Sequence, residues 1–204
     1  SGFMSNKIII RIAAIVLAVV VLAVVIWLIW PRPQLYYTMT TEEIDTDIRR
    51  VSWETPLIQD RMEYYSERFL GAPYELVAEG DGPHARYDQM PLLNLEQINC
   101  MTYCEIVMAL SLSDYYMDFF NILQRIRYRD GIIGMASRNH YTMGDWLPAN
   151  SWCLEDVTRS IAGDQTASVS RVISHKAFFA DKGIDTIPVM MSDRELTIDY
   201  IPFS

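Results

Sequence analysis

Three cysteines supply the thiols of this 204-residue chain, and Cys100 has the sequence context that best fits chemistry. It lies in the segment Ile98-Asn99-Cys100-Met101-Thr102-Tyr103-Cys104-Glu105, after a polar loop and at the expected start of an apolar helix. A thiolate at a helix N-terminus is stabilised by unpaired backbone N–H groups and by the helix dipole. The same N–H groups can hold an oxyanion when the sulfur attacks a carbonyl. This context favours Cys100 as a nucleophile, and a small buried hydrophobic side chain is the alternative.

The other two thiols have weaker claims to chemistry. Cys104 follows Cys100 by one helical turn and shares its face, but it lacks the helix end, so we expect it in the core. An i, i+4 pair within one helix is poorly aimed for a disulfide. Cys153 follows Trp152 in an expected loop and is assigned no role. The three cysteines lack the paired C-x2-C spacing of a zinc site, and no metal or cofactor is expected.

A second group of polar and aromatic residues surrounds His140. Arg138, Asp145 and Trp146 lie within a few residues of it, and this mixture suits the lip of a binding cleft. A single histidine is more often a hydrogen-bonded structural residue than a base, and that alternative stays open. A metal site on His140 and Asp145 would need further ligands that the sequence does not supply. The histidines at positions 84 and 175 have no such neighbours.

The elements that would position these residues are helices first and short strands later. The capping and periodicity signals predict a helix over residues 56–70, with Thr55 as its N-cap and Gly71 at its end. Within it, hydrophobic residues recur at helical spacing and predict a buried stripe: Ile58, Met62, Tyr65 and Phe69. Two more helices are expected over 100–112 and 115–128, an irregular loop over 79–91, and strands over 169–174, 187–191 and 196–201. This order predicts an α+β domain.

The N-terminus carries an uninterrupted apolar segment. Residues 12–30 include no charged or polar side chain, and at about 1.5 Å of rise per residue they match a hydrocarbon core of about 30 Å. Lys7 and Arg11 precede this segment, while Arg32 follows it, which favours a cytoplasmic N-terminus. We therefore expect residues 1–11 in the cytoplasm, a single-pass anchor in the inner membrane over 12–30, a linker over 31–53, and a domain over 54–204 facing the periplasm or the cell exterior. A cleaved signal peptide is the alternative.

Charge excludes one class of partner. Residues 1–33 hold three of the seventeen basic residues and none of the twenty-six acidic ones, so the remainder has 14 − 26 = −12 net charges. Such a surface argues against nucleic-acid binding and against close contact with an anionic membrane. No Walker or G-x-G-x-x-G pattern predicts a nucleotide site.

Three stretches in this order carry a family resemblance. They are Phe69-Leu70-Gly71-Ala72-Pro73-Tyr74, then the Cys100 segment with Met108-Ala109-Leu110, then Ile126-Arg127-Tyr128-Arg129 followed by Arg138-Asn139-His140-Tyr141 and Asp145-Trp146. Together they resemble the N-acetylmuramoyl-L-alanine amidase-like branch (DUF1460) of the NlpC/P60 cysteine peptidases, over about residues 55–204.

The resemblance implies a papain-like fold and hydrolysis of an amide bond in peptidoglycan or its stem peptides. Cys100 matches the nucleophile, and Tyr74 matches a tyrosine that lies beside it in related enzymes. Arg138, His140, Asp145 and Trp146 match a family signature, either in chemistry or in shaping the cleft. Asn99 departs from the family's aspartate, yet it keeps a side-chain acceptor. The strand with the family's histidine base would follow position 204, so we expect this chain to be part of a longer protein.

Three functions stay open at this level. The first is a membrane-anchored cysteine amidase or peptidase, with Cys100 as nucleophile and His140 as a substitute base. The second is a membrane-tethered module that binds cell-wall fragments through Tyr74, Tyr141 and Trp146 without catalysis. The third is an acyl transferase, because an acyl-enzyme can pass its acyl group to an amine as well as to water.

Overall fold

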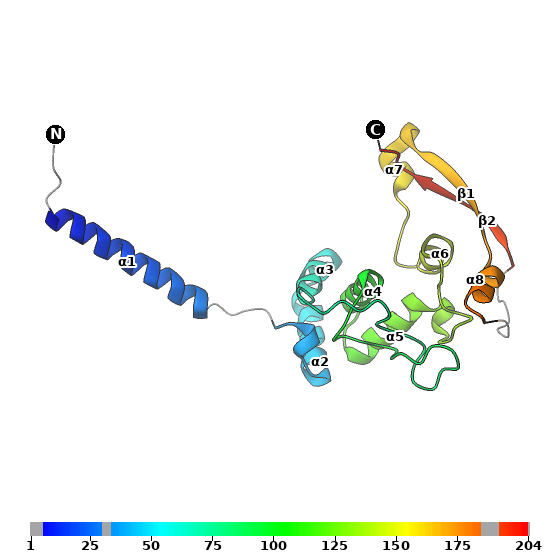
Figure 1. Ribbon diagram of the computed structural model, residues 1–204, viewed down its shortest axis with the longest axis horizontal. Helices are drawn as coiled ribbons and strands as arrows, with labels where there is room; N and C mark the ends of the chain where they lie inside the picture. The colour runs from blue at the N-terminus through cyan, green and yellow to red at the C-terminus, as the bar shows by residue number, and fades with distance from the viewer. Residues whose placement is uncertain (1–5, 30–33, 185–191, 204) are drawn as a thin grey trace. The chain divides into compact units, whose positions relative to one another are not determined.

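The computed structural model describes residues 6–29, 34–184 and 192–203. Contacts divide the chain into two compact units, Ser1–Gln34 and Leu35–Ser204, which are described separately here. The described residues of the first unit form one helix, α1 (Asn6–Ile29) (Figure 1). Its segment Ile8–Ile26 has a mean hydropathy of 3.2, and none of it is buried. By length and composition this helix could cross a membrane, and a signal sequence would pass the same test. Trp30, at the end of the expected anchor, lies outside the described residues.

The prediction that residues 31–53 form a linker is wrong for most of that range. Tyr36, in the short helix η1 (Tyr36–Thr38), and helix α2 (Thr41–Glu54) belong to the folded unit. Thr40 caps α2 in a capping box with Glu43. The helix buries one apolar stripe made of Ile44, Ile48 and Val51. Acidic residues on the other side of α2 gave this segment the composition of a linker, although its apolar residues recur at helical spacing.

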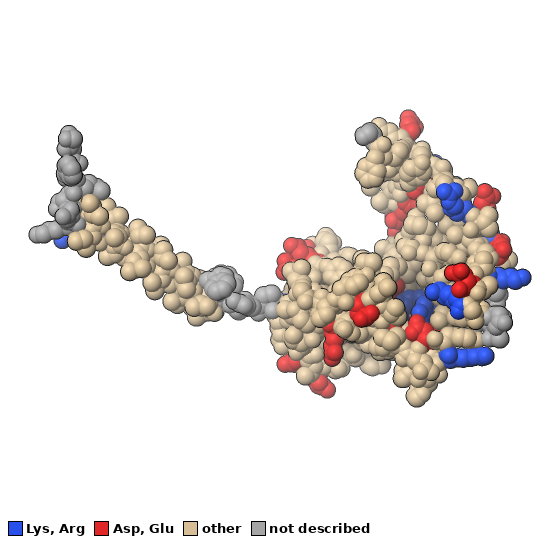
Figure 2. All heavy atoms as spheres, viewed as in Figure 1, with Lys and Arg blue, Asp and Glu red and all other residues tan. Residues whose placement is uncertain are grey.

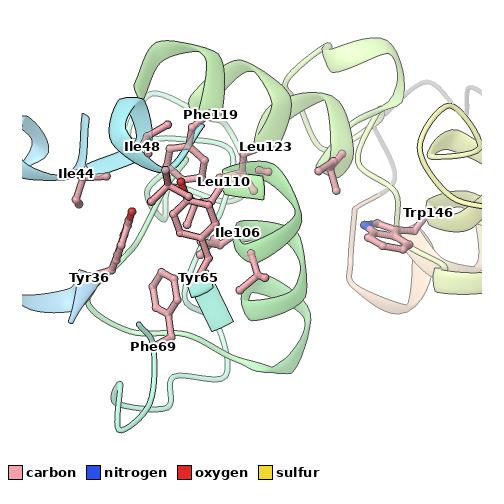
Figure 3. Packing of buried hydrophobic residues seen from close by; sticks show 14 residues of the cluster. Tyr36, Ile44, Ile48, Tyr65, Phe69, Ile106, Leu110, Phe119, Leu123 and Trp146 are labelled. Atoms are coloured by element: carbon pink, nitrogen blue, oxygen red, sulfur yellow. The ribbon is translucent and has the colours of Figure 1, made fainter. Parts of the chain in front are cut away.

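Three further helices complete the helical part of the unit. They are α3 (Ile58–Glu67), α4 (Cys100–Ser111) and α5 (Tyr116–Arg127), and α4 packs on both of the others. Figure 3 shows Tyr36, Tyr65 and Phe69 grouped together, with Ile48, Leu110, Phe119 and Leu123 nearby. The Tyr36 ring lies edge-on to Tyr65, with centroids 5.8 Å apart. Apolar burial therefore fixes the position of α4.

The predicted helix boundaries hold to about a residue for α4 and α5, but α3 is shorter than expected. Thr55 ends α2 instead of capping α3, and Leu57 occupies the N-cap position of α3. Tyr65 and Phe69 of the predicted stripe are buried, whereas Ile58 and Met62 are exposed. Gly71 adopts a φ of 83°, which explains a glycine at the turn after α3. Residues 79–91 form the expected irregular loop.

The rest of the second unit is a series of short elements and a small sheet. A π-helical turn, η3 (Thr142–Trp146), leads into α6 (Leu147–Ala149), and the short helices η2 (Arg129–Gly131), α7 (Thr158–Ala162) and η4 (Gly163–Gln165) connect the remaining segments. Strands β1 (Ala167–Ile173) and β2 (Arg194–Tyr200) pair antiparallel, with Val169 opposite Ile198. Helix α8 (His175–Asp181) follows β1 directly.

The sheet confirms two of the three predicted strands. The strand expected over residues 187–191 lies outside the described residues. The unit therefore combines helices with a small sheet, as the predicted α+β class requires. On the face shown in Figure 2, acidic side chains predominate over the part with α2 and α3, while basic and acidic side chains mix over the part with α8 and the strands.

Candidate active site

Cys100 is the first residue of α4 and its side chain is exposed. Asn99 caps the helix: its Oδ1 accepts from the N–H groups of Met101 and Thr102, both at 2.9 Å. The Thr102 side chain completes a capping box with the backbone N–H of Asn99, at 2.9 Å. Asn99 therefore provides the side-chain acceptor expected of it. Because Asn99 occupies those two N–H groups, the N–H of Cys100 itself is the one that α4 offers to an anion beside the thiol.

A second chain segment runs alongside the start of α4. Tyr74 forms an isolated parallel bridge with Ile98, in which Glu75 N donates to the Ile98 carbonyl at 3.0 Å. The Asn99 amide donates to the Leu76 carbonyl at 3.2 Å. Tyr74 itself is 67% exposed. The structure thus brings the predicted Tyr74 to the segment that carries Cys100, with its ring accessible.

The expectation that Cys104 is a core residue is wrong, because its side chain is exposed. The α4 residues that face the core are instead those around Ile106 and Leu110. Partial burial, together with Cys100 and Glu105, raises the pKa of the Cys104 thiol. Cys153 is half-buried, and its Sγ donates to the Asn150 carbonyl at 3.4 Å.

A buried polar cluster joins α4 to the residues that follow α5. Trp146 Nε1 donates to Glu105 Oε1 at 2.8 Å, and Arg127 Nε lies 3.9 Å from Glu105 and 3.3 Å from Glu79. Burial raises the pKa of Glu105 to about 7, although Arg127 and Trp146 act in the opposite direction. Burial also raises the pKa of Glu79. The cluster ties α4, the helix that begins at Cys100, to the loop before it and to η3.

Arg138 is an internal ion-pair partner. Its guanidinium pairs with Asp81 and with Asp88, the latter at 2.7 Å, so it secures the loop over residues 79–91. The Tyr128 hydroxyl lies 2.8 Å from the Asp81 carboxylate. Gly80 in this loop has no room for a Cβ, since the side chains of Asp88 and Met90 lie against it.

Asp145 is the centre of a second buried cluster. The His175 Nε2–H donates to one carboxylate oxygen at 2.8 Å, and Arg194 donates to the other at 2.7 Å. The backbone N–H of Tyr141 also donates to the carboxylate, at 3.0 Å. Burial would raise the pKa of Asp145, but these hydrogen bonds outweigh it and hold the pKa below its usual value. Asp145 thus connects η3 with α8 and β2.

His140 packs among aromatic side chains. Its ring centroid lies 4.5 Å from that of Phe178 and 5.2 Å from that of Phe179, both on α8. Its Nε2–H donates to the Met135 carbonyl at 2.7 Å. Burial lowers its pKa. In the described part of the chain, no hydrogen bond or ring contact connects His140 with Cys100.

The predicted site residues therefore fall into separate groups. Cys100 and Tyr74 lie together at an exposed helix start, while Trp146, Arg138 and Asp145 make contacts inside the fold. Asp145 and Trp146 are only 3% and 6% exposed, which argues against direct contact with a substrate. Their part in substrate binding stays a prediction.

Sequence reasoning missed two residues of these clusters. Glu105 could have been found, because it is the one charged residue in the apolar segment of α4 and a buried charge needs a partner. The partnership of His175 with Asp145 spans thirty residues, and no local pattern predicts it. Among the described residues, no group of three or more His, Cys, Asp or Glu side chains could hold a metal ion.

Two solved structures are similar to this chain in fold. A Legionella pneumophila protein described under the family DUF1460 is 28% identical, with a TM-score of 0.68, over 79% of this chain and 63% of its own. An N-acetylmuramoyl-L-alanine amidase from Bacteroides uniformis is 28% identical, with a TM-score of 0.51, over 64% of this chain and 56% of its own. The chain thus spans less than two thirds of the length of these solved relatives.

The family follows from the sequence match as well as from the fold. Residues 64–204 match the model of the family described as N-acetylmuramoyl-L-alanine amidase-like. The chain belongs to this N-acetylmuramoyl-L-alanine amidase-like family. A search of curated proteins found no match.

Proposed function

We propose that this protein hydrolyses amide bonds in peptidoglycan or its stem peptides, with Cys100 as the nucleophile. Family membership supports the reaction class and the substrate. The observation that carries the choice of residue is the exposed Cys100 thiol at the capped start of α4, beside the accessible Tyr74. Both features are what thiol attack on an external carbonyl requires.

The reaction follows from this geometry. The Cys100 sulfur forms a bond to the amide carbonyl carbon, and the Cys100 N–H donates to the oxyanion that develops. The carbon–nitrogen bond then breaks, the amine leaves with a proton, and a thioester remains on Cys100. Water attacks the thioester, releasing the carboxylate and restoring the thiol.

The reaction also needs a proton acceptor. His140 as base stays a prediction, and its contacts with Met135 and α8 favour a structural part instead. An NlpC/P60, papain-like arrangement, with a base supplied from elsewhere in the whole protein, fits Cys100 better. Tyr74 is proposed to line the substrate site with its exposed ring, and Arg138 is proposed to shape the site by holding the loop over 79–91.

Membrane attachment belongs to the same proposal. Helix α1 is long and apolar enough to anchor the protein, with the second unit on the side of the membrane where peptidoglycan lies. This places the Cys100 site within reach of nascent or mature cell wall.

A catalytically inactive binding module is the second candidate. It is favoured by the contacts of His140, which engage the ring within the fold instead of with Cys100. Tyr74, 67% exposed, would then stack on a sugar or a stem peptide.

The test compares the three thiols in the full chain, held in detergent. Iodoacetamide is added at several pH values, and alkylation at each cysteine is followed by mass spectrometry. We expect Cys100 to react fastest at pH 7, ahead of Cys104, which is also exposed but whose thiol pKa is raised. Hydrolysis of muropeptides, lost in Cys100→Ser but not in Cys153→Ser, would then establish the enzyme. If Cys100 reacts no faster than Cys104 in the folded chain, the nucleophile is rejected.

A further inference from the structure

The face of α4 that carries Cys100 displays a second thiol one turn later. Cys100 and Cys104 are separated by four residues on a regular helix, and both side chains are exposed. Residues at this spacing lie on the same side of a helix, with Cβ atoms about 5–6 Å apart. The pair therefore forms a dithiol open to solvent.

The spacing of the two cysteines determines whether a disulfide or a bridging atom can link their sulfurs. A disulfide needs Cβ atoms about 3.5–4.5 Å apart, so direct oxidation would require α4 to distort at its first turn. That turn is held by the Asn99–Thr102 capping box. A bridging atom removes the conflict, because two metal–sulfur bonds of about 2.3 Å allow the sulfurs to lie up to about 4.6 Å apart. The geometry favours a bridged dithiol over a disulfide.

The two sulfur ligands favour one class of bridging atom, a soft metal cation. Thiolates select soft cations, and two sulfurs suit a cation that accepts few ligands, such as Cu(I). Met108 follows Cys104 by four residues on α4 and is half-buried, so a third soft sulfur lies next along the helix. Hard cations that prefer oxygen have no comparable attraction to this face.

We propose that Cys100 and Cys104 form a two-thiolate site for a soft, thiophilic cation of the Cu(I) class. Binding forms two metal–sulfur bonds and releases the two thiol protons to water, with no electron transferred. Occupancy removes the free thiol of Cys100, so the site is inhibitory; this consequence, unlike the binding itself, rests on the proposed hydrolase function.

Phenylarsine oxide is the probe, since trivalent arsenic needs two nearby thiols for a durable adduct. Its reaction forms two sulfur–arsenic bonds, breaks the arsenic–oxygen double bond and releases one water, and arsenic stays trivalent. The full chain in detergent is reduced, freed of reductant and titrated, and the adduct is counted by intact mass. We expect one adduct per chain that survives excess monothiol and is released by a dithiol, in the wild type and in Cys153→Ser alike.

Single variants separate a dithiol from a lone reactive cysteine. Cys100→Ser and Cys104→Ser should each bind the probe at least about 100-fold more weakly, because the second bond is intramolecular only when both thiols are present. Cys104→Ala should repeat the result, and circular dichroism verifies the helices. Cu(I) competed against bicinchoninate should show one tight site in the wild type and none in Cys104→Ser.

Three results would overturn the proposal: equal adduct strength in Cys104→Ser, no adduct in folded wild type, or a chain 2 Da lighter that shows a Cys100–Cys104 disulfide in air. Failure of the hydrolase proposal gives a different pattern. The probe would still bind both thiols, while muropeptides would stay intact before and after its removal.

Discussion

The two parts of the folded unit are held together by different forces. In the helical part, Leu110, Phe119, Leu123 and Ile126 are fully buried, and α4 packs on both α3 and α5. In the part after residue 140, no residue of β1 or β2 is buried. Within that part, the Asp145 carboxylate attaches α8 and β2 to η3 through its bonds to His175 and Arg194.

This difference indicates how each part should respond to substitutions. The helix that carries Cys100 is fixed by apolar contacts, which are non-directional and spread over many residues. Besides the packing of Phe178 and Phe179 on His140, α8 and β2 are attached by a few charge-assisted hydrogen bonds, which are strong but fail when one partner is lost. Substitutions should therefore act globally in the first part and locally in the second.

The largest expected effect tests the apolar half of the comparison. Leu110→Ala should lower the free energy of unfolding by about 2–5 kcal/mol, because it removes a fully buried side chain and leaves a cavity. Val172→Ala on β1, where the side chain is 72% exposed, should cost less than about 0.5 kcal/mol. Urea unfolding of both variants measures the difference. Equal losses would show that the strands are as tightly packed as the helices.

The second prediction tests the polar attachment. Asp145→Ala should cost about 2 kcal/mol, since it leaves the buried His175 and the partly exposed Arg194 without their carboxylate. Amide hydrogen exchange should accelerate in α8 and β2 but not in α5. Asp164→Ala, an exposed aspartate in the same part of the chain, is the control. Uniform acceleration through α5 would contradict a local attachment.

The third prediction uses pH, because the two parts should respond in opposite directions. The pKa of Glu105 is raised from about 4.5 to about 7, so the folded state binds its proton more tightly than the unfolded state does. Stability from this group is present below pH 4.5 and is lost as pH rises towards 7, by at most about 1.4 kcal/mol per pH unit. The pKa of Asp145 is lowered, so the stability that this group contributes is present above pH 3.8 and is lost in stronger acid.

Chemical unfolding at pH 5 and pH 7.5 measures the Glu105 contribution. Glu105→Gln should flatten the decline with rising pH, leaving the share of Glu79, whose pKa is raised in the same direction, and the opposite share of His140, whose pKa burial lowers. An unchanged decline in Glu105→Gln would assign the pH dependence to other groups.

The smallest effect concerns the start of α4. Asn99→Ala removes the acceptor for two backbone N–H groups and should cost about 1 kcal/mol. Asn99→Asp keeps the acceptor and adds a negative charge at the helix N-terminus, so it should be neutral or stabilising by about 0.3–1 kcal/mol. Thermal unfolding of both variants is the measurement. A large loss in Asn99→Asp would mean that the amide's bond to the Leu76 carbonyl dominates.

The sequence predicted those features that depend on neighbouring residues. Helices α4 and α5 follow from periodicity and capping, and the pairing partners β1 and β2 from their β-branched composition. The position of Cys100 at a helix start follows from the same local signals, whereas its exposure does not. The acidic surface of α2 concealed its buried stripe, so local composition there gave the wrong element.

Features that depend on distant contacts were beyond the sequence. Arg138 pairs with residues fifty or more positions away, and Asp145 with His175 thirty positions away. A single sequence does not show which distant segments lie side by side. These charged residues therefore looked as well suited to a binding cleft as to internal ion pairs. Cys104 shows the same limit on a smaller scale: helical spacing placed it on the Cys100 face but could not tell whether that face met the core.

The wide turn at η3 constrains how the chain can change in length. Trp146 N donates to the Tyr141 carbonyl five residues earlier, at 3.0 Å, as in a π-helix. Asp145 and Trp146, adjacent in the chain, there serve two separate clusters. A one-residue deletion would restore α-helical winding and rotate everything beyond it by about 100°. Among working relatives, insertions and deletions should therefore be excluded between Tyr141 and Leu147 even where the residues themselves vary.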